Sequence, residues 1–209
     1  MGKLEAQPDT PQWYAARRGC LTASRMADVL AIKKDGKPTA ERQRYLIELV
    51  AERMTGNAVT HYVTDAMQWG IDREPHAVAE YEAVSGNMAM GSGFYLHDRI
   101  EFFGATPDRE VDSDGLIEVK CPTTSTYVGW LMADVVPEQH KPQMLAQLAV
   151  TGRKWCDFVA FDPRVMAGPK LFVRRFQPAP EEIAAVEDAA VKFLAEVDAA
   201  FDAVTGGCE

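Results

Sequence analysis

Hydrophobic residues recur at two spacings along this chain, and these spacings separate expected helices from expected strands. In four stretches the apolar positions lie three or four residues apart, which places them on one face of a helix. These stretches are residues 39–54, 64–85, 136–152 and 181–201. Gly56 and Gly86 follow the first two stretches and are typical of helix ends. A shorter helix through Met26, Val29 and Leu30 is also expected.

Short apolar runs bounded by turn residues predict strands between these helices. The runs are residues 93–98, 100–106, 115–121, 157–161 and 171–176. The first two are joined at Asp98-Arg99, and the third follows a turn at residues 112–115. We expect these three strands to form one meander that brings Asp108 close to Glu118.

Residues 104–122 carry the clearest candidate chemistry. Side chains alternate between the two faces of a strand, so Glu118 and Lys120 point to one face and Val119 to the other. The turn can fold Asp108 back beside them. Two carboxylates and an ammonium would then meet in a layout suited to holding a hard divalent cation against a phosphodiester. The same residues also suit an ordinary half-exposed strand with a charged outer face.

Glu74 is a second candidate, because it falls on an otherwise apolar helix stripe. The apolar members of that stripe are Met67, Ile71, Val78 and Tyr81. A carboxylate in such a position is costly unless it is paired or binds a metal ion. Pro75 follows directly, so the helix is expected either to kink there or to end, with Glu74 capping a second helix.

A phosphate pocket is a third candidate, near the beginning of the chain. Thr22 or Ser24 can cap the helix that follows. A helix start with free N–H groups, hydroxyls and nearby Arg17 suits a phosphate. Simple capping beside a surface arginine explains the same residues.

Composition narrows the class of protein. With 209 residues and 47% hydrophobic content, the chain can bury one substantial core, so residues 1–209 are expected to form a single domain. The first eleven residues are too polar for a signal peptide, and no apolar run is long enough to cross a bilayer. The four cysteines are scattered without C-x-x-C spacing, which favours a reducing cytoplasm.

Net charge limits the mode of nucleic-acid binding. A value of −9 argues against a surface coated in positive charge, although basic residues can still be concentrated locally. Candidate clusters are Arg17-Arg18 with Arg25, Lys33-Lys34 with Lys37, and Arg153-Lys154. Each of them also suits an ordinary solvated face.

Five motifs together resemble one family, the phage lambda-type exonucleases of the PD-(D/E)xK group. In chain order they are W-Y-A-A-R-R-G-C-L-T-A-S, W-G-I-D-R-E-P-H-A, T-P-D, G-L-I-E-V-K-C-P and Q-M-L-A-Q-L-A-V-T-G followed by F-D-P. The resemblance implies an α/β fold with a restriction-endonuclease-like core, in which helices flank a mixed β-sheet. The expected order of elements is compatible with that fold.

The resemblance also implies roles for individual residues. Asp108 and Glu118 match metal-binding carboxylates, Lys120 the catalytic lysine, Glu74 a helical acidic residue of the metal site and Gln143 a glutamine of the following helix. The backbone carbonyl of Val119 is an implied metal ligand. The implied contacts to the 5′-phosphate or to DNA are Arg17, Ser24, Thr106, Lys34 and Met67, the last as a wedge at the terminal base pair. Pro75, His140 and Leu145 depart from the family pattern.

The activity implied is hydrolysis of one strand of linear double-stranded DNA from its 5′ end, leaving 3′ single-stranded tails for recombination. One or two Mg²⁺ ions are implied as cofactors, with Mn²⁺ as a possible substitute. A free DNA end, a ring-shaped homotrimer and a single-strand-annealing recombinase are the implied partners. Two alternatives stay open: an endonuclease of the restriction or repair type with the same metal site, and a DNA-binding protein with a degenerate site.

Overall fold

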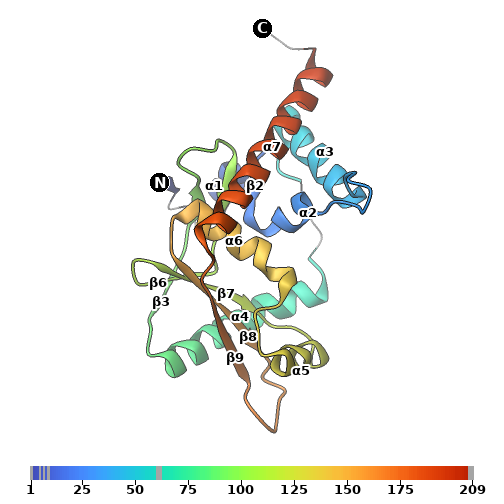
Figure 1. Cartoon of the computed structure of the whole chain (residues 1–209). Helices are drawn as coiled ribbons and strands as arrows, with labels where there is room; N and C mark the ends of the chain where they lie inside the picture. The colour runs from blue at the N-terminus through green and yellow to red at the C-terminus, as the bar shows by residue number, and fades with distance from the viewer. Residues whose placement is uncertain (1, 5, 7, 9, 60–62, 207–209) are drawn as a thin grey trace.

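A computed structural model describes residues 2–4, 6, 8, 10–59 and 63–206 (Figure 1). Its helices are α1 Pro11–Arg17, α2 Met26–Leu30, α3 Ala40–Thr55, α4 Asp65–Ser85, α5 Thr124–Ala133, α6 Lys141–Thr151 and α7 Pro180–Thr205, with short 3-10 turns η1 Ala23–Arg25 and η2 Glu138–His140. Its strands are β1 Gly2–Leu4, β2 Leu21–Thr22, β3 Ala89–Gly91, β4 Phe94–Leu96, β5 Phe103–Ala105, β6 Arg109–Val111, β7 Gly115–Lys120, β8 Trp155–Phe161 and β9 Leu171–Phe176.

A five-stranded mixed sheet in the order β3-β6-β7-β8-β9 forms the centre of the fold. Only β7 and β8 run parallel, and α5 and α6 make the crossover between them. α4 packs its buried Ala77, Val78 and Tyr81 on one face of the sheet. On the other face, α6 packs Met144 and Leu148. The sequence prediction of a mixed α/β fold is confirmed.

A smaller sheet in the order β1-β4-β5-β2 lies beside this core. It shares a second hydrophobic cluster with α2, α3, α6 and α7, in which Tyr45 and Phe193 stack with ring centroids 5.6 Å apart. This division corrects the expected meander. β4 and β5 pair with each other, whereas β7 pairs with β6 and β8 in the other sheet. The strand β6, which the sequence did not single out, brings Asp108 beside β7.

Helix boundaries follow capping chemistry. Thr39 and Thr64 accept hydrogen bonds from backbone amides at the starts of α3 and α4, and Gly56 and Gly86 end both helices with positive φ angles. Pro75 lies inside α4, which continues to Ser85 as one helix, so a second helix starting at Glu74 is wrong. Because Pro75 has no N–H, the carbonyl one turn earlier loses its helical partner, and neighbouring packing must offset that loss.

Two further expectations need correction. Neither Thr22 nor Ser24 caps the helix that follows, because η1 has no side-chain cap and the Thr22 and Ser24 hydroxyls lie 3.4 Å from each other. The expected helix over residues 136–152 begins at Lys141, and α5 before it was missed. No helix among the described residues is both long and apolar enough to cross a membrane.

Candidate active site and phosphate pocket

Glu118 is the centre of the polar cluster on β7. Its side chain has no solvent exposure, since α6 covers the face of the sheet to which it points. Lys120 Nζ donates to Glu118 Oε1, and Gln147 Nε2 donates to Glu118 Oε2 at 2.6 Å. Both carboxylate oxygens are therefore bonded, and the interpretation of this stretch as a half-exposed strand with a solvated charged face is wrong.

Asp108 lies at the edge of the same strand. The pairing of β6 with β7 ends at Arg109 opposite Ile117, so the Val119 amide has no strand partner on that side. Asp108 Oδ2 accepts this amide at 2.7 Å instead. Because the amide and carbonyl of one residue in an extended strand point to the same side, the Val119 carbonyl also points toward Asp108.

The electrostatics of this cluster explain its pKa shifts. Burial, followed by repulsion from Glu118, raises the pKa of Asp108 to about 8. Burial alone would lower the pKa of Lys120, but Glu118 and Asp108 outweigh it and raise that pKa. The ammonium of Lys120 is thus held in its charged form, whereas the Asp108 carboxyl keeps its proton up to about pH 8.

Glu74 reaches the cluster from α4. Its Oε1 lies 2.7 Å from Arg109 Nη1, and the same nitrogen donates to the Asp108 carbonyl at 2.5 Å. Arg109 was not predicted from the sequence, since an arginine at the start of a strand carries no distinctive pattern. The carboxylate on the apolar stripe is therefore paired, and the exposed residues Met67 and Ile71 show that only the later part of that stripe faces the core.

The donor set fits a hard divalent cation. Among the described residues, no group of three or more His, Cys, Asp and Glu side chains lies close enough together to hold a metal ion. The oxygen donors present are Asp108, Glu118 and the Val119 carbonyl, a set that suits Mg²⁺ or Mn²⁺ rather than zinc. Burial and the neighbouring Glu118 raise the pKa of Asp108 because they disfavour its charged form, and a bound cation would favour that form.

A cavity of about 180 Å³ joins this cluster to the beginning of the chain. Asp108, Gln143 and Gln147 line one part of it. The rest is lined by Trp13, Arg17, Thr22, Ala23, Ser24 and Thr106. Three of the residues that the resemblance assigns to a phosphate therefore lie in one cavity with Asp108. Gln147 was not assigned, although its position four residues after Gln143 places both on one helix face.

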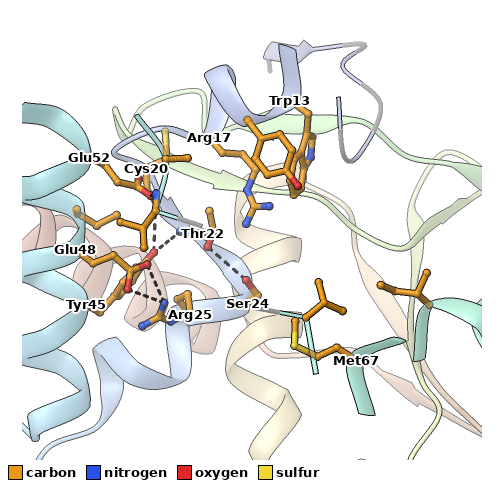
Figure 2. Close-up of a pocket in the computed structure, with 16 residues that line it drawn as sticks. Trp13, Arg17, Cys20, Thr22, Ser24, Arg25, Tyr45, Glu48, Glu52 and Met67 are labelled. Atoms are coloured by element: carbon orange, nitrogen blue, oxygen red, sulfur yellow. Dashed lines mark hydrogen bonds and ion pairs between the residues drawn. The ribbon is translucent and has the colours of Figure 1, made fainter. Parts of the chain in front are cut away.

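Trp13 connects two of these residues. Its indole Nε1 donates to Thr106 Oγ1 at 3.0 Å, and the Arg17 guanidinium lies 3.8 Å above its ring centroid. Burial lowers the pKa of Arg17, and no carboxylate among the described residues forms a salt bridge with it. An arginine remains charged in a protein even so. Its guanidinium points toward Thr22 and Ser24 (Figure 2).

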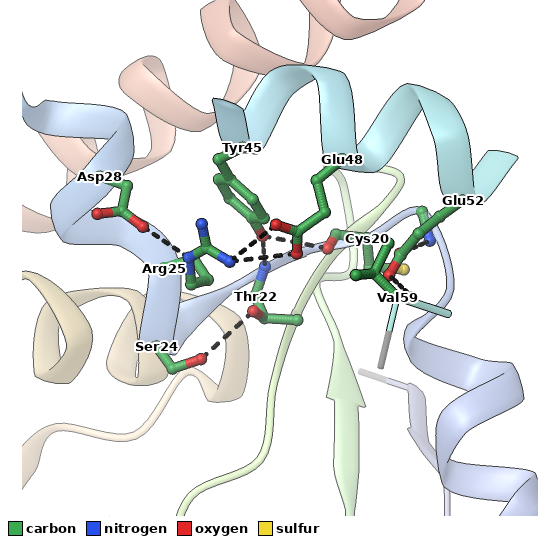
Figure 3. Close-up of polar contacts among 10 residues, drawn as sticks. Cys20, Thr22, Ser24, Arg25, Asp28, Tyr45, Glu48, Glu52 and Val59 are labelled. Atoms are coloured by element: carbon green, nitrogen blue, oxygen red, sulfur yellow. Dashed lines mark hydrogen bonds and ion pairs between the residues drawn. The ribbon is translucent and has the colours of Figure 1, made fainter. Parts of the chain in front are cut away.

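A larger cavity of about 730 Å³ continues from the smaller one. Met67 lines it, across from Arg17 in Figure 2. In its polar wall, Arg25 contacts both Asp28 and Glu48, while Thr22 N donates to the Tyr45 hydroxyl at 3.0 Å (Figure 3). Lys34, by contrast, is exposed in the turn between Ile32 and Pro38 and lines neither cavity.

Glu52 holds two walls of this cavity together. Its Oε2 accepts from Gly19 N and its Oε1 from Val59 N, both at 2.8 Å. The buried carboxylate thus fixes the turn after Arg17 against the segment that leads toward α4 (Figure 3).

Comparisons with known proteins identify relatives of this arrangement. The family model described as the YqaJ-like viral recombinase domain matches residues 12–154. Two structures of LHK-Exo share 38% identity with the chain: the alkaline exonuclease from Laribacter hongkongensis, with a TM-score of 0.85 over 94% of this chain and 96% of that one, and its complex with dAMP, with a TM-score of 0.84 over 93% and 96%. A phage-related exonuclease from Haemophilus somnus 129PT, at 15% identity, has a TM-score of 0.66 over 88% of this chain and 96% of its own, which supports the fold alone. No curated protein matches the chain.

Proposed function

Since this chain belongs to the YqaJ-like viral recombinase family, we propose that it is a Mg²⁺-dependent 5′-to-3′ exonuclease. It would digest one strand of linear double-stranded DNA and leave 3′ single-stranded tails for recombination. Alkaline exonuclease relatives at 38% identity support a DNA-acting hydrolase. The observation that carries the end-dependent activity is the shared cavity, because Asp108 lines it together with Arg17, Ser24 and Thr106.

The metal site would consist of Asp108, Glu118 and the Val119 carbonyl, with Glu74 nearby. One or two Mg²⁺ ions bound there would supply a water of lowered pKa and neutralise charge on the phosphate under attack, with Mn²⁺ as a possible substitute. The Asp108 carboxyl must release its proton to act as a ligand. Its contact with Val119 N holds it in place for that role.

Lys120 and the two glutamines would act on the substrate and on the carboxylates. The charged Lys120 ammonium can stabilise the negative charge that develops on the phosphate oxygens or orient the attacking water. Gln147 holds Glu118 Oε2 in one orientation, and Gln143 lines the cavity where the scissile phosphate would lie. Met67 would separate the terminal base pair at the mouth of the larger cavity.

The 5′-phosphate would be recognised by the Arg17 guanidinium together with the Ser24 and Thr106 hydroxyls. Because the Trp13 indole N–H already occupies a lone pair of Thr106 Oγ1, the Thr106 hydroxyl hydrogen can point to a phosphate oxygen. Lys34, which lies outside both cavities, would contact DNA farther from the reaction.

The test uses linear and covalently closed circular plasmid with Mg²⁺, with the linear ends either phosphorylated or dephosphorylated. We expect digestion of the phosphorylated linear DNA and none of the circular DNA. EDTA should stop the reaction. Arg17→Ala should lower the rate at phosphorylated ends by about 10²-fold and change the rate at hydroxyl ends little. Cleavage of closed circles would instead identify an endonuclease, and equal losses at both kinds of end would contradict the phosphate pocket.

Assembly and partners are separate proposals that rest on the resemblance. They comprise a homotrimer ring around DNA and a single-strand-annealing recombinase that takes up the 3′ tail. Light scattering of the purified protein tests the first, with a mass of three chains expected and a monomer contradicting it.

A further inference from the structure

One tryptophan outside both cavities carries two arginines. The guanidinium carbons of Arg73 and Arg164 each lie 4.6 Å from the ring centroid of Trp69. Trp69 and Arg73 lie one turn apart on α4, whereas Arg164 follows the end of β8. None of the three lines the smaller or the larger cavity. The two guanidiniums therefore form a second cationic site, separate from the phosphate pocket.

This second site occupies its own face of α4. Successive residues of an α-helix are turned by about 100°, so a shift of two residues places side chains on nearly opposite faces. Met67 and Ile71 line the larger cavity, and Trp69 and Arg73 each follow one of them by two residues. A ligand at Trp69 and Arg73 would therefore be a different group from the one held at Arg17.

Arg73 keeps its positive charge without a partner. It forms no hydrogen bond or ion pair with any described residue, because the adjacent Glu74 pairs with Arg109 at 2.7 Å instead. Arg73 Nε and Trp69 Nε1 are both buried without a hydrogen-bond partner among the described residues. The Arg73 side chain as a whole is only partly buried, so its terminal nitrogens are open to a ligand. An unpaired guanidinium of this kind suits an anion.

Arg164 is held in place by the end of the central sheet. Its Nε donates to Asp162 Oδ1 at 2.7 Å, and its Nη2 donates to the Pro122 carbonyl at 2.8 Å. Its Nη1 bonds to no described residue, and the side chain is 44% exposed. Pro122 follows Lys120 by two residues, so this guanidinium lies within roughly 12 Å of the Lys120 backbone. Asp162 balances part of its charge, so Arg73 supplies most of the positive charge of the site.

We propose that Trp69, Arg73 and Arg164 bind a backbone phosphate of the DNA duplex, distinct from the scissile phosphate and from the 5′-terminal one. This inference rests on the proposed function, because it takes DNA as the substrate. Double-stranded DNA carries a negative charge about every 1.7 Å of its axis, so a duplex cleaved beside Lys120 brings further phosphates close to this site.

Each member of the site has a separate role in that contact. Trp69 fixes the two guanidiniums against its ring, and their free N–H groups donate to phosphate oxygens. A contact to phosphate alone carries no base preference. The site therefore suits an enzyme that must hold DNA of any sequence while it removes nucleotides.

The experiment measures DNA binding without turnover. Full-length protein in EDTA is titrated into a labelled, 5′-phosphorylated duplex of about 20 base pairs, at several salt concentrations between about 50 and 200 mM. Arg73→Gln should weaken binding about tenfold and reduce the slope of log affinity against log salt by about 0.9, the value of one lost phosphate contact. Arg73→Lys keeps the charge and should keep most of that slope.

A small ligand separates this site from the phosphate pocket. The affinity for 2-deoxyribose 5-phosphate, measured by calorimetry, should change in neither variant of Arg73, because we expect that ligand at Arg17. Thermal melts show that each variant is folded. An equal loss of affinity for the duplex and for the sugar phosphate in Arg73→Gln would contradict a separate site.

Arg44 offers a matched control, because it is an exposed arginine on α3 that, like Arg73, forms no ion pair with a described residue. Arg44→Gln should keep the wild-type affinity and salt slope. An unchanged slope in Arg73→Gln, or an equal reduction in Arg44→Gln, would overturn the site. So would a wild-type protein that binds the duplex no more tightly than 2-deoxyribose 5-phosphate. Failure of the proposed function looks different: Mg²⁺ would then release no nucleotides from linear DNA, although the duplex still binds through Arg73.

Discussion

The end of β7 and the beginning of the chain provide two kinds of polar surface. At β7, the polar groups hydrogen-bond to one another: Lys120 and Gln147 donate to the two oxygens of Glu118, and Val119 N donates to Asp108. In the phosphate pocket, Arg17 lies on the ring of Trp13 and forms no salt bridge with a described carboxylate. Under the proposed function, the first region would be preorganised for chemistry, whereas the second would leave the positive charge of Arg17 for the substrate.

The largest expected effect comes from removing the carboxylate charge of Asp108 beside β7, which should affect turnover but not phosphate binding. Asp108→Asn keeps an oxygen that can accept the Val119 amide but loses the carboxylate charge, so turnover should fall by at least about 10³-fold. Binding of 2-deoxyribose 5-phosphate should persist, because Arg17 supplies the main charge for it. Nucleotide release from phosphorylated linear DNA measures the first quantity and calorimetry the second.

Asp112→Asn is the matched control for that variant. Asp112 lies four residues later, is exposed, and has a positive φ of 49°, a conformation that asparagine tolerates. It should retain wild-type turnover. Turnover by Asp108→Asn at the wild-type rate would remove Asp108 from the proposed metal site.

The same contrast explains how far the sequence could be interpreted alone. Glu118 and Lys120 lie two residues apart on one strand, so strand periodicity was enough to place them together. The link from Trp13 to Thr106 spans 93 positions and passes between α1 and the end of β5. No local pattern can predict such a contact, and only the resemblance brought Arg17, Ser24 and Thr106 into one list.

The errors have physical causes as well. The expected hairpin at residues 98–99 forms between β4 and β5, but the third strand of the meander was assigned to the wrong sheet. Which sheet a strand joins depends on the hydrophobic surface it buries: β4 and β5 pack with α2, α3, α6 and α7, whereas β7 packs Ile117 and Val119 against α4. Pro75 was expected to interrupt α4, yet packing of Ala77, Val78 and Tyr81 on the sheet holds the helix together. In both cases tertiary burial outweighed a local signal.

A second expected effect concerns the stability of the metal-free protein. The pKa of Asp108 is about 8 in the folded protein, above its ordinary value of 3.8, so the folded state holds a proton that the unfolded state has released between these values. Stability should therefore fall as the pH rises from about 4 to about 8. Asp108→Asn has no such proton and should lose less stability over that range.

Thermal melts in EDTA at pH 5 and pH 8.5 compare the two proteins. We expect the melting temperature of the wild type to fall several degrees farther than that of Asp108→Asn, since about 1 kcal/mol corresponds to roughly 2–4 °C in a chain of this size. Mg²⁺ should restore the wild type at pH 8.5 and leave the variant unchanged. Parallel falls in both proteins would show that the burial of Asp108 does not control this range.

The smallest expected effect tests whether Trp13 positions the phosphate ligands. Trp13→Phe keeps an aromatic ring under Arg17 but loses the N–H that donates to Thr106 Oγ1. One hydrogen bond is worth about 0.5–1.5 kcal/mol, so KM for phosphorylated ends should rise about 2- to 10-fold with kcat unchanged. Thr106→Val removes the other partner. If the two act through their shared bond, the double variant should lose less than the sum of the two single losses; full additivity would mean that Trp13 acts through packing alone.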